Sequence, residues 1–483
     1  MLKNKLIRLV SSVSRKEMTR FRELAESPYF NKHKDTLTLV HYLSTVYPRF
    51  DEETCCRFQV YQQLYPGQPH DQSQLALIFT YTLRLFEKFL IQERFKDRMP
   101  LHNILLLSDL RMRKHYMLYE KNLHRAETEL YKGEKRDSGY YNRKYQLARE
   151  ADNYYKQIQK RRKDDSIQRK QKNLDLFYLS EKLKDTCEME VRRKILKVDY
   201  NTHLLDAVIQ EVASNLSVYK PEPSIYLYYT LYQMIVHSDH QFYFEAYKVL
   251  QHNQGYFEQP ELKSLYNYLQ NYCIEQINRG ESQFLKEIFK LYQSQIGQGL
   301  LIEDGYLSEW HYKNIVTTGI RLGEMDWVKH FVETYKEQLH PESRENAYLF
   351  NLASYYYATK QLDKVLDLLV KVEYNDLRYN LGAKALLLRT YYDLEEYEPL
   401  FSLTESFKQY LLRNKLMADS RRTGYANLFR LTRRTAQIKA NAAFVSKEKT
   451  QKEVKKLEKD LRDTQTVFNK SWLEEKIREL VVL

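Results

Sequence analysis

Apolar and polar residues alternate along most of the chain with the period of an α-helix. Near the start, Leu6 and Val10 share one helical face. Asp71 has the short polar side chain of a helix N-cap, and Leu75 and Ile78 begin the apolar face of the helix expected after it. Long alternating runs of Val, Ile and Thr, which would predict strands, do not occur. The pattern predicts an all-α protein.

Glycine and proline are scarce, with 12 and 10 copies in 483 residues. Average usage is about 7% and 5%, so both are well below it. Because these residues mark turns and break helices, their scarcity indicates long helices joined by short connections. A chain of this length has room for about three domains or for one extended repeat array.

One stretch recurs at a regular interval. The segment LASYYYATKQLDKVLDLL, residues 352–369, aligns with residues 387–404 when it is moved forward by 35 positions. Fainter copies place an equivalent position at Tyr243, Ser282, Met325, Leu362 and Tyr397, separated by 39, 43, 37 and 35 residues. Self-similarity at this spacing is typical of stacked helical hairpins, none of which can bury its apolar face alone.

The expected turn between the two helices of each copy resembles that of tetratricopeptide repeats, in which a glycine precedes an apolar residue and then a small one. Gly280 and Gly323 keep the glycine, whereas Lys360 and Glu395 replace it. Only Ala246 keeps the small residue in this alignment. The resemblance implies a right-handed α-solenoid of degenerate tetratricopeptide-like hairpins, while a peptide-clasping groove does not follow from it.

The first 95 residues contain four short motifs in a fixed order: SPYFNK (27–32), YPRF (47–50), YQQLYPG (61–67) and LFEKFL (85–90). Together they resemble the N-terminal signature of a widespread bacterial family of uncharacterised helical proteins. This resemblance implies a helical head followed by degenerate tetratricopeptide-like repeats, and it brings no catalytic residues. We therefore expect four parts: an N-terminal helical domain over 1–97, a charged helical region over 98–220, repeats over 221–445 and a C-terminal amphipathic capping helix over 446–483.

The tail should dock on the last repeat. Trp472, Leu473 and Ile477 form its apolar face. Val454, Leu457 and Leu461 precede them near coiled-coil spacing and would form an apolar seam. Thr464 interrupts this seam, so a free coiled coil is not expected. A capping role fits a terminal helix of this kind.

Positive charge is concentrated in two windows. The chain has a net charge of +13. Residues 132–172 hold 14 Lys and Arg against 6 Asp and Glu, and residues 411–447 hold 9 against 1, a net charge of +8 in each window. Such windows indicate contact with an acidic partner, or else solvated helix faces.

The helix expected around 421–443 is the best candidate binding surface. At 100° per residue, an arc of about 120° holds four arginines: Arg422, Arg430, Arg433 and Arg434. The opposite side holds Leu428, Thr432, Thr435, Ile438 and Ala442. Gly424 interrupts the helix-forming pattern, and a break there would detach Arg422. Arginine suits carboxylate and phosphate through its bidentate fork. A secondary basic patch comprises Lys160, Arg161, Arg162 and Lys163.

Tyrosine is unusually frequent, at 42 copies. Its rings could stack on bases or on the side chains of a peptide. More often, buried tyrosine fills space between helices while its hydroxyl finds a polar partner. Core packing is therefore the preferred interpretation.

No motif for catalysis or for a cofactor stands out. Phosphate-binding loops, nucleophile elbows and zinc-protease signatures are absent. His237 and His240 have a spacing that permits metal binding, but no Glu or Cys completes a pattern. The sequence therefore predicts a protein that is not an enzyme and needs no cofactor or metal. An enzyme whose unrecognised active site lies between the head and the repeats is an alternative to this prediction.

Four cysteines, Cys55, Cys56, Cys187 and Cys273, form neither a disulfide framework nor a zinc spacing. The start of the chain lacks the features of a signal peptide, and no apolar run approaches the roughly 18 residues that span a bilayer. We expect a cytoplasmic protein that does not insert into membranes. Its expected function is that of a non-enzymatic α-solenoid scaffold or adaptor for a protein partner. The alternative is a nucleic-acid-binding helical protein that uses basic faces near 132–172 and 411–447.

Overall fold

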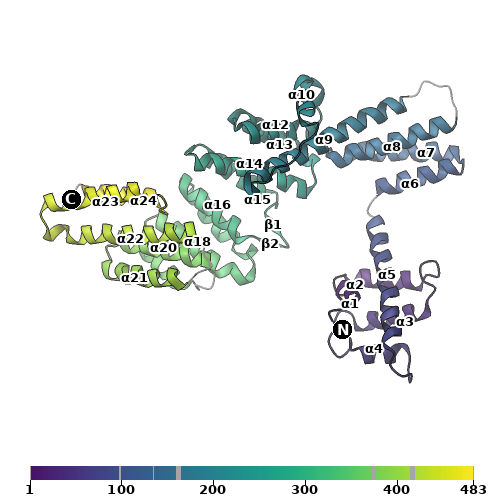
Figure 1. The fold of residues 1–483 in the computed structure, drawn as a ribbon, viewed down its shortest axis with the longest axis horizontal. Coiled ribbons are helices and arrows are strands. Elements are labelled where there is room, and N and C mark those ends of the chain that lie inside the picture. Colours follow the sequence, from purple (N-terminus) through teal and green to yellow (C-terminus); the bar gives the residue numbers. More distant parts are fainter. Residues whose placement is uncertain are drawn as a thin grey trace. The chain divides into compact units, whose positions relative to one another are not determined.

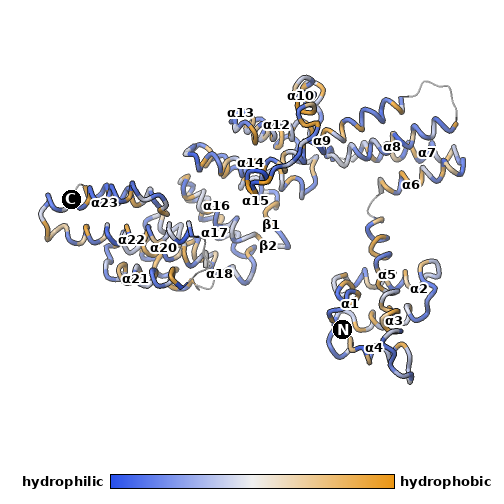
Figure 2. The backbone as a smooth tube through the Cα atoms, viewed as in Figure 1, coloured by the Kyte–Doolittle hydropathy of each residue, from blue (hydrophilic) through white to orange (hydrophobic). Residues whose placement is uncertain are grey.

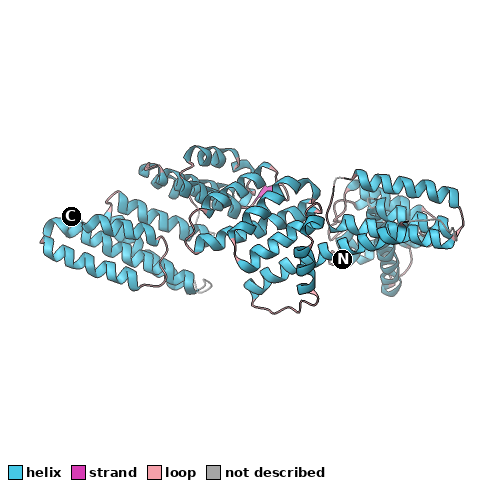
Figure 3. Ribbon diagram, turned by 90° about the horizontal axis from the view of Figure 1, so that it is seen from above, coloured by secondary structure: helices cyan, strands magenta, loops and turns pink. Residues whose placement is uncertain are grey.

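The computed structural model describes residues 2–96, 99–133, 135–158, 165–372, 377–413 and 419–481 (Figure 1). Within these residues the protein is all-helical, as predicted, apart from one small antiparallel sheet of β1 (Ile302–Glu303) and β2 (Tyr306–Leu307). Hydrophobic and hydrophilic positions alternate along the helices (Figure 2), and helical ribbon prevails throughout (Figure 3).

The chain divides into two compact units. The first comprises Met1–Asp185 and Leu204–Ile225, and the second comprises Thr186–His203 and Tyr226–Leu483. Unit 1 thus contains the segment predicted as the head, and unit 2 contains the segments predicted as repeats and tail except residues 221–225, which belong to unit 1. The finer boundaries at 97, 220 and 445 stay predictions.

The head in unit 1 contains five helices: α1 (Lys5–Val10), α2 (Arg15–Glu26), α3 (Lys34–Val46), α4 (Arg57–Leu64) and α5 (Gln72–Lys96). Helices α2, α3 and α4 each end just before the residue that precedes a proline: Pro28, Pro48 and Pro66. A proline disfavours helical geometry at the residue before it, so these three pairs set the helix lengths.

Helix α5 organises the core of the head. Asp71 caps it as predicted, since its carboxylate accepts hydrogen bonds from the N–H groups of Ser73 (2.8 Å) and Gln74 (3.1 Å). Helices α1, α2 and α3 all contact α5. Phe21 of α2 meets Phe86 of α5 edge to face, with 4.8 Å between ring centroids. Both rings are fully buried, so apolar packing fixes α2 against α5.

The remaining helices that begin in unit 1 are α6 (Met99–Met112), α7 (Tyr116–Lys132), α8 (Ser138–Gln157), α9 (Ser166–Leu196), α10 (Leu205–Ser214), α11 (Leu216–Tyr219) and α12 (Pro223–His237). Tyrosines hold α7 against α8. The rings of Tyr119 and Tyr154 stack with 4.1 Å between centroids, and both are buried. Tyr154 donates a hydrogen bond to Glu120 at 2.8 Å.

Unit 2 continues with α13 (His240–Asn253), η1 (Gln254–Tyr256), α14 (Gln259–Asn278), α15 (Phe284–Gly297), α16 (Glu309–Leu322), α17 (Met325–Thr334), η2 (Lys336–Gln338), α18 (Pro341–Ala358), α19 (Leu362–Leu369), α20 (Leu377–Asp393) and α21 (Tyr397–Arg413). Consecutive helices pack in pairs: α14 on α15, α16 on α17, α18 on α19 and α20 on α21. In addition, α16 contacts α18, α18 contacts α20, and α20 contacts α22 (Asp419–Asn441). Each pair therefore also covers the next.

The turn between α12 and α13 and the turns within the four helix pairs share one backbone feature. Each contains a residue with a positive φ, between 53° and 98°: Ser238, Gly280, Gly323, Lys360 and Glu395. The positions that the sequence alignment marks at Met325, Leu362 and Tyr397 begin α17, α19 and α21, two residues after the left-handed residue. The left-handed geometry persists where the glycine is lost.

The first copy in the sequence alignment is displaced by three residues. Ser238 is equivalent to Gly323, so His240 rather than Tyr243 begins the second helix. Tyr243 therefore takes the position assigned to Ala246, and it is fully buried there. None of the five turns is followed by a small residue at this position. Polar Ser238 gave no glycine signal, which is why the alignment slipped.

The tail forms two helices, α23 (Lys447–Asp463) and α24 (Lys470–Val481), rather than the single helix expected over 446–483. Helix α23 ends before Thr464, whose hydroxyl donates to the carbonyl of Asp460 at 2.6 Å. On α24, Trp472, Leu473 and Ile477 are buried as predicted, in one cluster with residues of α20 and α22. Polar Thr464, which interrupts the apolar seam, thus marks the end of α23.

Candidate functional site

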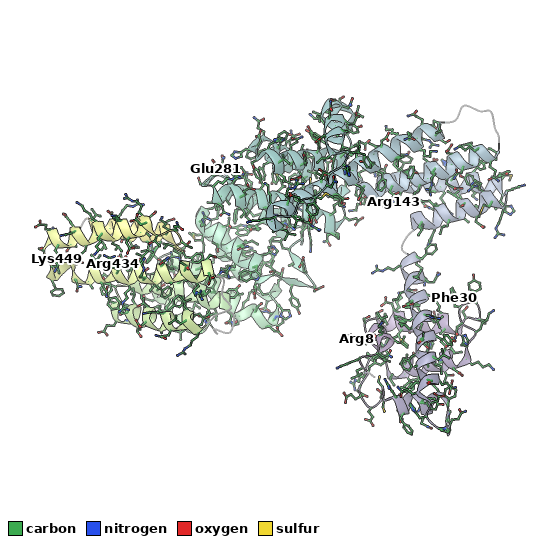
Figure 4. The ribbon with its side chains drawn as sticks, viewed as in Figure 1. Arg8, Phe30, Arg143, Glu281, Arg434 and Lys449 are labelled. Carbon is green, nitrogen blue, oxygen red and sulfur yellow. The ribbon has the colours of Figure 1, made fainter. Side chains whose placement is uncertain are left out.

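Helix α22 (Asp419–Asn441) carries the four arginines that the sequence proposes as a contact site; Arg434 is labelled in Figure 4. Four of the five residues expected on its opposite face are buried: Leu428, Thr432, Thr435 and Ile438. The fifth, Ala442, lies beyond the helix in a short turn, η3 (Ala442–Phe444). The helix continues through Gly424, so Arg422 stays on the same helix as the other arginines.

A groove of about 880 Å³ lies between α21 and α22. Apolar side chains from both helices line its floor: Phe407, Leu411, Leu412, Ala426 and Phe429. Polar and charged side chains line the rest: Thr404, Glu405, Lys408, Arg422, Thr423, Asn427, Arg430 and Arg433. Three of the four predicted arginines thus border one groove, together with one lysine and one carboxylate. We call this the α21–α22 groove.

Two stacked phenylalanines form the base of the α21–α22 groove. The rings of Phe407 and Phe429 lie 3.7 Å apart between centroids, with 17° between their planes. Both side chains are almost fully buried, at 1% and 3% exposure. Leu412, in contrast, is 65% exposed. A ligand in the groove can therefore contact the edges of the two phenylalanine rings and the side chain of Leu412. The ring faces that stack on each other are not accessible to it.

Each of the four arginines has a carboxylate partner. Arg422 pairs with Asp419, Arg433 pairs with Glu405 at 3.1 Å, and both Arg430 (2.8 Å) and Arg434 (3.0 Å) pair with Asp460 of α23. Residues 411–447 hold a single acidic residue, Asp419, so the sequence of this window predicts little acid near these arginines. The acids come mostly from other helices, α21 and α23, so the pattern within one helix could not reveal them.

Asp460 connects the arginine helix to the tail. Hydrogen bonds from Arg430 and the charges of both arginines hold the pKa of its carboxyl below the usual range, despite the opposing effect of burial. Arg434 does not line the groove and faces Asp460 instead. Arg422, Arg430 and Arg433 keep side-chain exposures of 42%, 50% and 41%. Because exposed ion pairs contribute little, these three guanidinium groups can exchange partners at small cost.

The secondary basic patch, Lys160, Arg161, Arg162 and Lys163, lies outside the described residues. Helices α8 and α9 lie on either side of it in the sequence, and ion pairs join α9 to both α8 and α7. The carboxylate of Asp152, which is 4% exposed, lies 2.9 Å from Lys156 and 2.5 Å from Lys170. Arg169 pairs with Glu127 at 2.9 Å. Part of the positive charge in 132–172 is therefore balanced locally.

Tyrosine hydroxyls bond to carboxylates on neighbouring helices and, for Tyr141, to Glu222 in the turn before α12. The pairs are Tyr141–Glu222 (2.8 Å), Tyr154–Glu120 (2.8 Å), Tyr226–Glu245 (2.9 Å), Tyr228–Glu261 (2.8 Å) and Tyr357–Asp393 (2.5 Å). All five tyrosines are buried. These tyrosines fill space between helices, which is the interpretation preferred from the sequence. The sequence did not indicate which carboxylates bond to their hydroxyls.

The two histidines considered as metal ligands lie at the turn before α13. The ring of His240 packs edge to face against Phe284, with 4.8 Å between centroids. Within the described ranges, no three His, Cys, Asp or Glu side chains gather so that they could hold a metal ion. No helix in the described part of the chain has both the length and the apolarity needed to cross a membrane.

The chain has no match among protein-family models, curated proteins or solved structures. The α21–α22 groove must therefore be interpreted from its own chemistry, which combines an apolar floor with a cationic rim.

Proposed function

We propose that this protein is a non-enzymatic scaffold that binds a protein partner, built as a right-handed α-solenoid of degenerate tetratricopeptide-like hairpins. The paired helices of unit 2, the contacts of every second helix and the shared left-handed turn residues support this proposal. In such an array each hairpin buries its apolar face on its neighbours, and the terminal helices cover the last one. Helices α23 and α24 serve as that cover.

The partner segment that suits the α21–α22 groove is short, acidic and amphipathic. Apolar side chains of this segment would contact Leu412 and the edges of the groove floor. Its carboxylates would bind Arg422, Arg430 and Arg433, whose planar forks hold carboxylates in a bidentate manner. The single observation that carries the proposal is this juxtaposition of a cationic rim and an apolar floor, which is the usual arrangement for a helix docked in a groove.

A protein segment fits the groove better than a nucleic acid does. Proteins that bind single strands offer exposed aromatic faces for base stacking, yet Phe407 and Phe429 stack on each other and are buried. Phosphate binding also favours cations without acidic neighbours, whereas Glu405 lines this groove. A nucleic acid remains the alternative outcome of the test.

The test compares purification and direct binding. The tagged full-length protein would be purified from its native host at low salt, with and without nuclease, and co-eluting proteins identified by mass spectrometry. Fluorescence anisotropy would then measure binding of the identified partner's acidic segment, of the same peptide with its acids changed to amides, and of a single-stranded oligonucleotide. The double variant Arg430→Gln/Arg433→Gln alters the groove. Arg421→Gln, on the same helix but outside the groove, is the matched control.

We expect a stoichiometric protein that survives nuclease treatment. Its acidic peptide should bind the groove variant at least roughly tenfold more weakly than the wild type, since each charge-assisted hydrogen bond contributes about 1.5–3 kcal/mol. The control should bind like the wild type. Nuclease-sensitive nucleic acid that is lost from the groove variant would sink the protein-partner proposal. Equal peptide binding by the groove variant and the control would also contradict it.

A further inference from the structure

A second site lies in the head, far along the chain from the α21–α22 groove. A pocket of about 170 Å³ opens at the start of α3, beside the SPYFNK motif that contains Phe30 (Figure 4). The loop before α3 and one face of α5 line it. The α5 residues Tyr81, Arg84, Leu85 and Lys88 follow the spacing of a single helical face. We call it the head pocket.

The loop in front of α3 is fixed by Asn31. Its side-chain amide donates to the carbonyl of Ala25 at 3.0 Å, and its oxygen accepts from the backbone N–H of His33 at 2.9 Å. The His33 ring in turn stacks on Tyr81 of α5, with 4.9 Å between centroids and 14° between planes. The mouth of the pocket is therefore held by hydrogen bonds and stacking.

The N-terminus of α3 faces this pocket without a cap. His33 occupies the N-cap position, and among the residues that the structure describes its side chain accepts no hydrogen bond from the first turn. The first N–H groups of a helix have no partner within it, and the helix dipole places partial positive charge there. These amides can donate to an anion.

Thr36 gives an independent indication of a ligand. It is only 2% exposed and lines the pocket, yet its Oγ1 has no hydrogen-bond partner among the described residues. Leaving a buried hydroxyl unpaired costs its full desolvation free energy, so most buried hydroxyls are hydrogen-bonded. Thr36 lines the pocket but its Oγ1 is covered, so a rotation of the side chain toward the pocket would let a ligand oxygen supply the missing partner.

Three cations complete the lining. Lys32 from the loop and Arg84 and Lys88 from α5 line the head pocket, and within the described part of the chain none of them forms an ion pair or a side-chain hydrogen bond. The nearest carboxylate along α3, that of Asp35, accepts a hydrogen bond from Tyr65 at 2.5 Å and does not line the pocket. The pocket thus has cations and donors in excess of acceptors.

We propose that the head pocket binds a phosphate group, either as the free anion or as the end of a small phosphate monoester. Guanidinium and ammonium groups, a hydroxyl and uncapped helix amides together supply the donors that its oxygens accept. The small volume suits one such group rather than a polymer backbone.

Isothermal titration calorimetry on the full-length protein tests this proposal with inorganic phosphate and with glycerol 3-phosphate, at constant ionic strength set with chloride. The variants Arg84→Gln and Lys88→Gln each remove a cation of the pocket. Arg94→Gln removes a cation from the same helix outside the pocket and is the matched control. Thr36→Val keeps the shape of the side chain and removes only the hydroxyl.

We expect saturable binding of inorganic phosphate by the wild type and by Arg94→Gln. Arg84→Gln and Lys88→Gln should each weaken it roughly tenfold, and Thr36→Val several-fold. Without phosphate, Thr36→Val should melt at the same temperature as the wild type or higher, because it removes an unpaired buried hydroxyl; a misfolded variant would melt lower. Equal binding of glycerol 3-phosphate would assign the site to monoesters, and its exclusion would assign it to the free anion. The proposal would be overturned if neither inorganic phosphate nor glycerol 3-phosphate bound saturably. Equal phosphate affinity of Arg84→Gln and Arg94→Gln would also overturn it.

Discussion

Lys476 of α24 forms a salt bridge with Asp393 of α20, with 3.1 Å between Nζ and Oδ1 and only 10% and 9% of the two side chains exposed. The same carboxylate accepts a hydrogen bond from Tyr357 of α18 at 2.5 Å, and Glu479 lies 2.9 Å from the ammonium group. Three helices distant in sequence thus meet at one buried charge. Apolar packing of α24 and this ion pair together hold the tail on the last hairpins.

Breaking this pair should destabilise unit 2 strongly. Asp393→Ala leaves the Lys476 ammonium with Glu479 and the more distant Glu475 as its partners and removes the acceptor of Tyr357, so we expect a loss of about 3 kcal/mol in the free energy of unfolding, the lower end of the range for a broken buried pair. Glu475→Ala removes a more exposed carboxylate, 3.9 Å from the same ammonium, and should change stability by less than about 1 kcal/mol. Denaturant unfolding of the full-length protein measures both.

A double-mutant cycle separates the ion pair from general packing. Lys476→Met and Asp393→Ala together should cost less than the sum of the two single changes, because neither charge is then left alone in the interior. If the two effects simply add, the salt bridge does not couple α24 to α20.

How the tail docks could be predicted only in part. The spacing of Trp472, Leu473 and Ile477 identifies the buried face of α24 correctly. The partner of Lys476 lies on a helix far away in the sequence, and no local pattern points to it. The same holds for Arg430, whose partner Asp460 comes from α23. Spacing reveals which face of a helix is buried, whereas the charges that meet across helices depend on the packing itself.

The turn before α19 is a place where a glycine should stabilise the protein. Lys360 has φ of 61°, is exposed and forms no ion pair with any residue that the structure describes. A left-handed conformation costs a residue with a Cβ atom about 1–2 kcal/mol, and glycine avoids that cost. We expect Lys360→Gly to raise the free energy of unfolding by about 0.5–1 kcal/mol.

The opposite sign is expected for the same change inside a helix. Lys329 is exposed within α17, and Lys329→Gly should lower stability by about 1 kcal/mol. Thermal and denaturant unfolding of both variants give the comparison. A loss of stability on Lys360→Gly would show that the left-handed turn is not a source of strain.

These turns also explain what the repeat pattern could and could not predict. Gly280 and Gly323 mark their turns in the sequence, and the aligned positions at Met325, Leu362 and Tyr397 all begin helices. Ser238 adopts the same left-handed geometry without any sequence signal, and there the alignment failed by three residues. Backbone conformation is conserved across the five turns more closely than residue type.

Gly424 permits the tail to cross α22 closely. A Cβ atom added there would lie 2.7 Å from the ring of Phe468, and the N–H of Phe468 donates to the Gly424 carbonyl at 3.3 Å. Gly424→Ala should therefore destabilise the protein by about 1 kcal/mol or more, because the clash outweighs the better helix propensity of alanine.

The sign should reverse once the ring is removed. In a Phe468→Ala background, Gly424→Ala should stabilise the protein by up to about 1 kcal/mol, since the helix propensity of alanine is then opposed only by a contact of 3.3 Å with Thr466 Cγ2, which a small shift relieves. Unfolding free energies of the four proteins complete the cycle. Equal effects in both backgrounds would mean that the ring moves aside freely and that the glycine is not required for the crossing.

The buried tyrosines should make the protein sensitive to alkali. Burial raises the pKa of Tyr292 to about 12, from an ordinary value of 10.0. The pKa of Tyr226 is also raised to about 12, mainly by burial and in addition by the hydrogen bond to Glu245. Above pH 10 such tyrosines release their protons in the unfolded chain before they do so in the folded one. Stability is therefore fully present below pH 10 and is lost as pH rises toward 12.

Each such tyrosine adds at most about 1.4 kcal/mol per pH unit to the slope in this window. Tyr292→Phe keeps the buried ring and removes the titrating hydroxyl, so the slope of unfolding free energy against pH should become shallower by up to that amount. Tyr29 is 87% exposed, and Tyr29→Phe is the control that should leave the slope unchanged. Denaturant unfolding at several pH values between 9 and 11 measures the slope of the unfolding free energy against pH for each protein. An unchanged slope for Tyr292→Phe would show that its hydroxyl reaches water in the folded protein, because a group equally solvated in both states cannot link folding to pH.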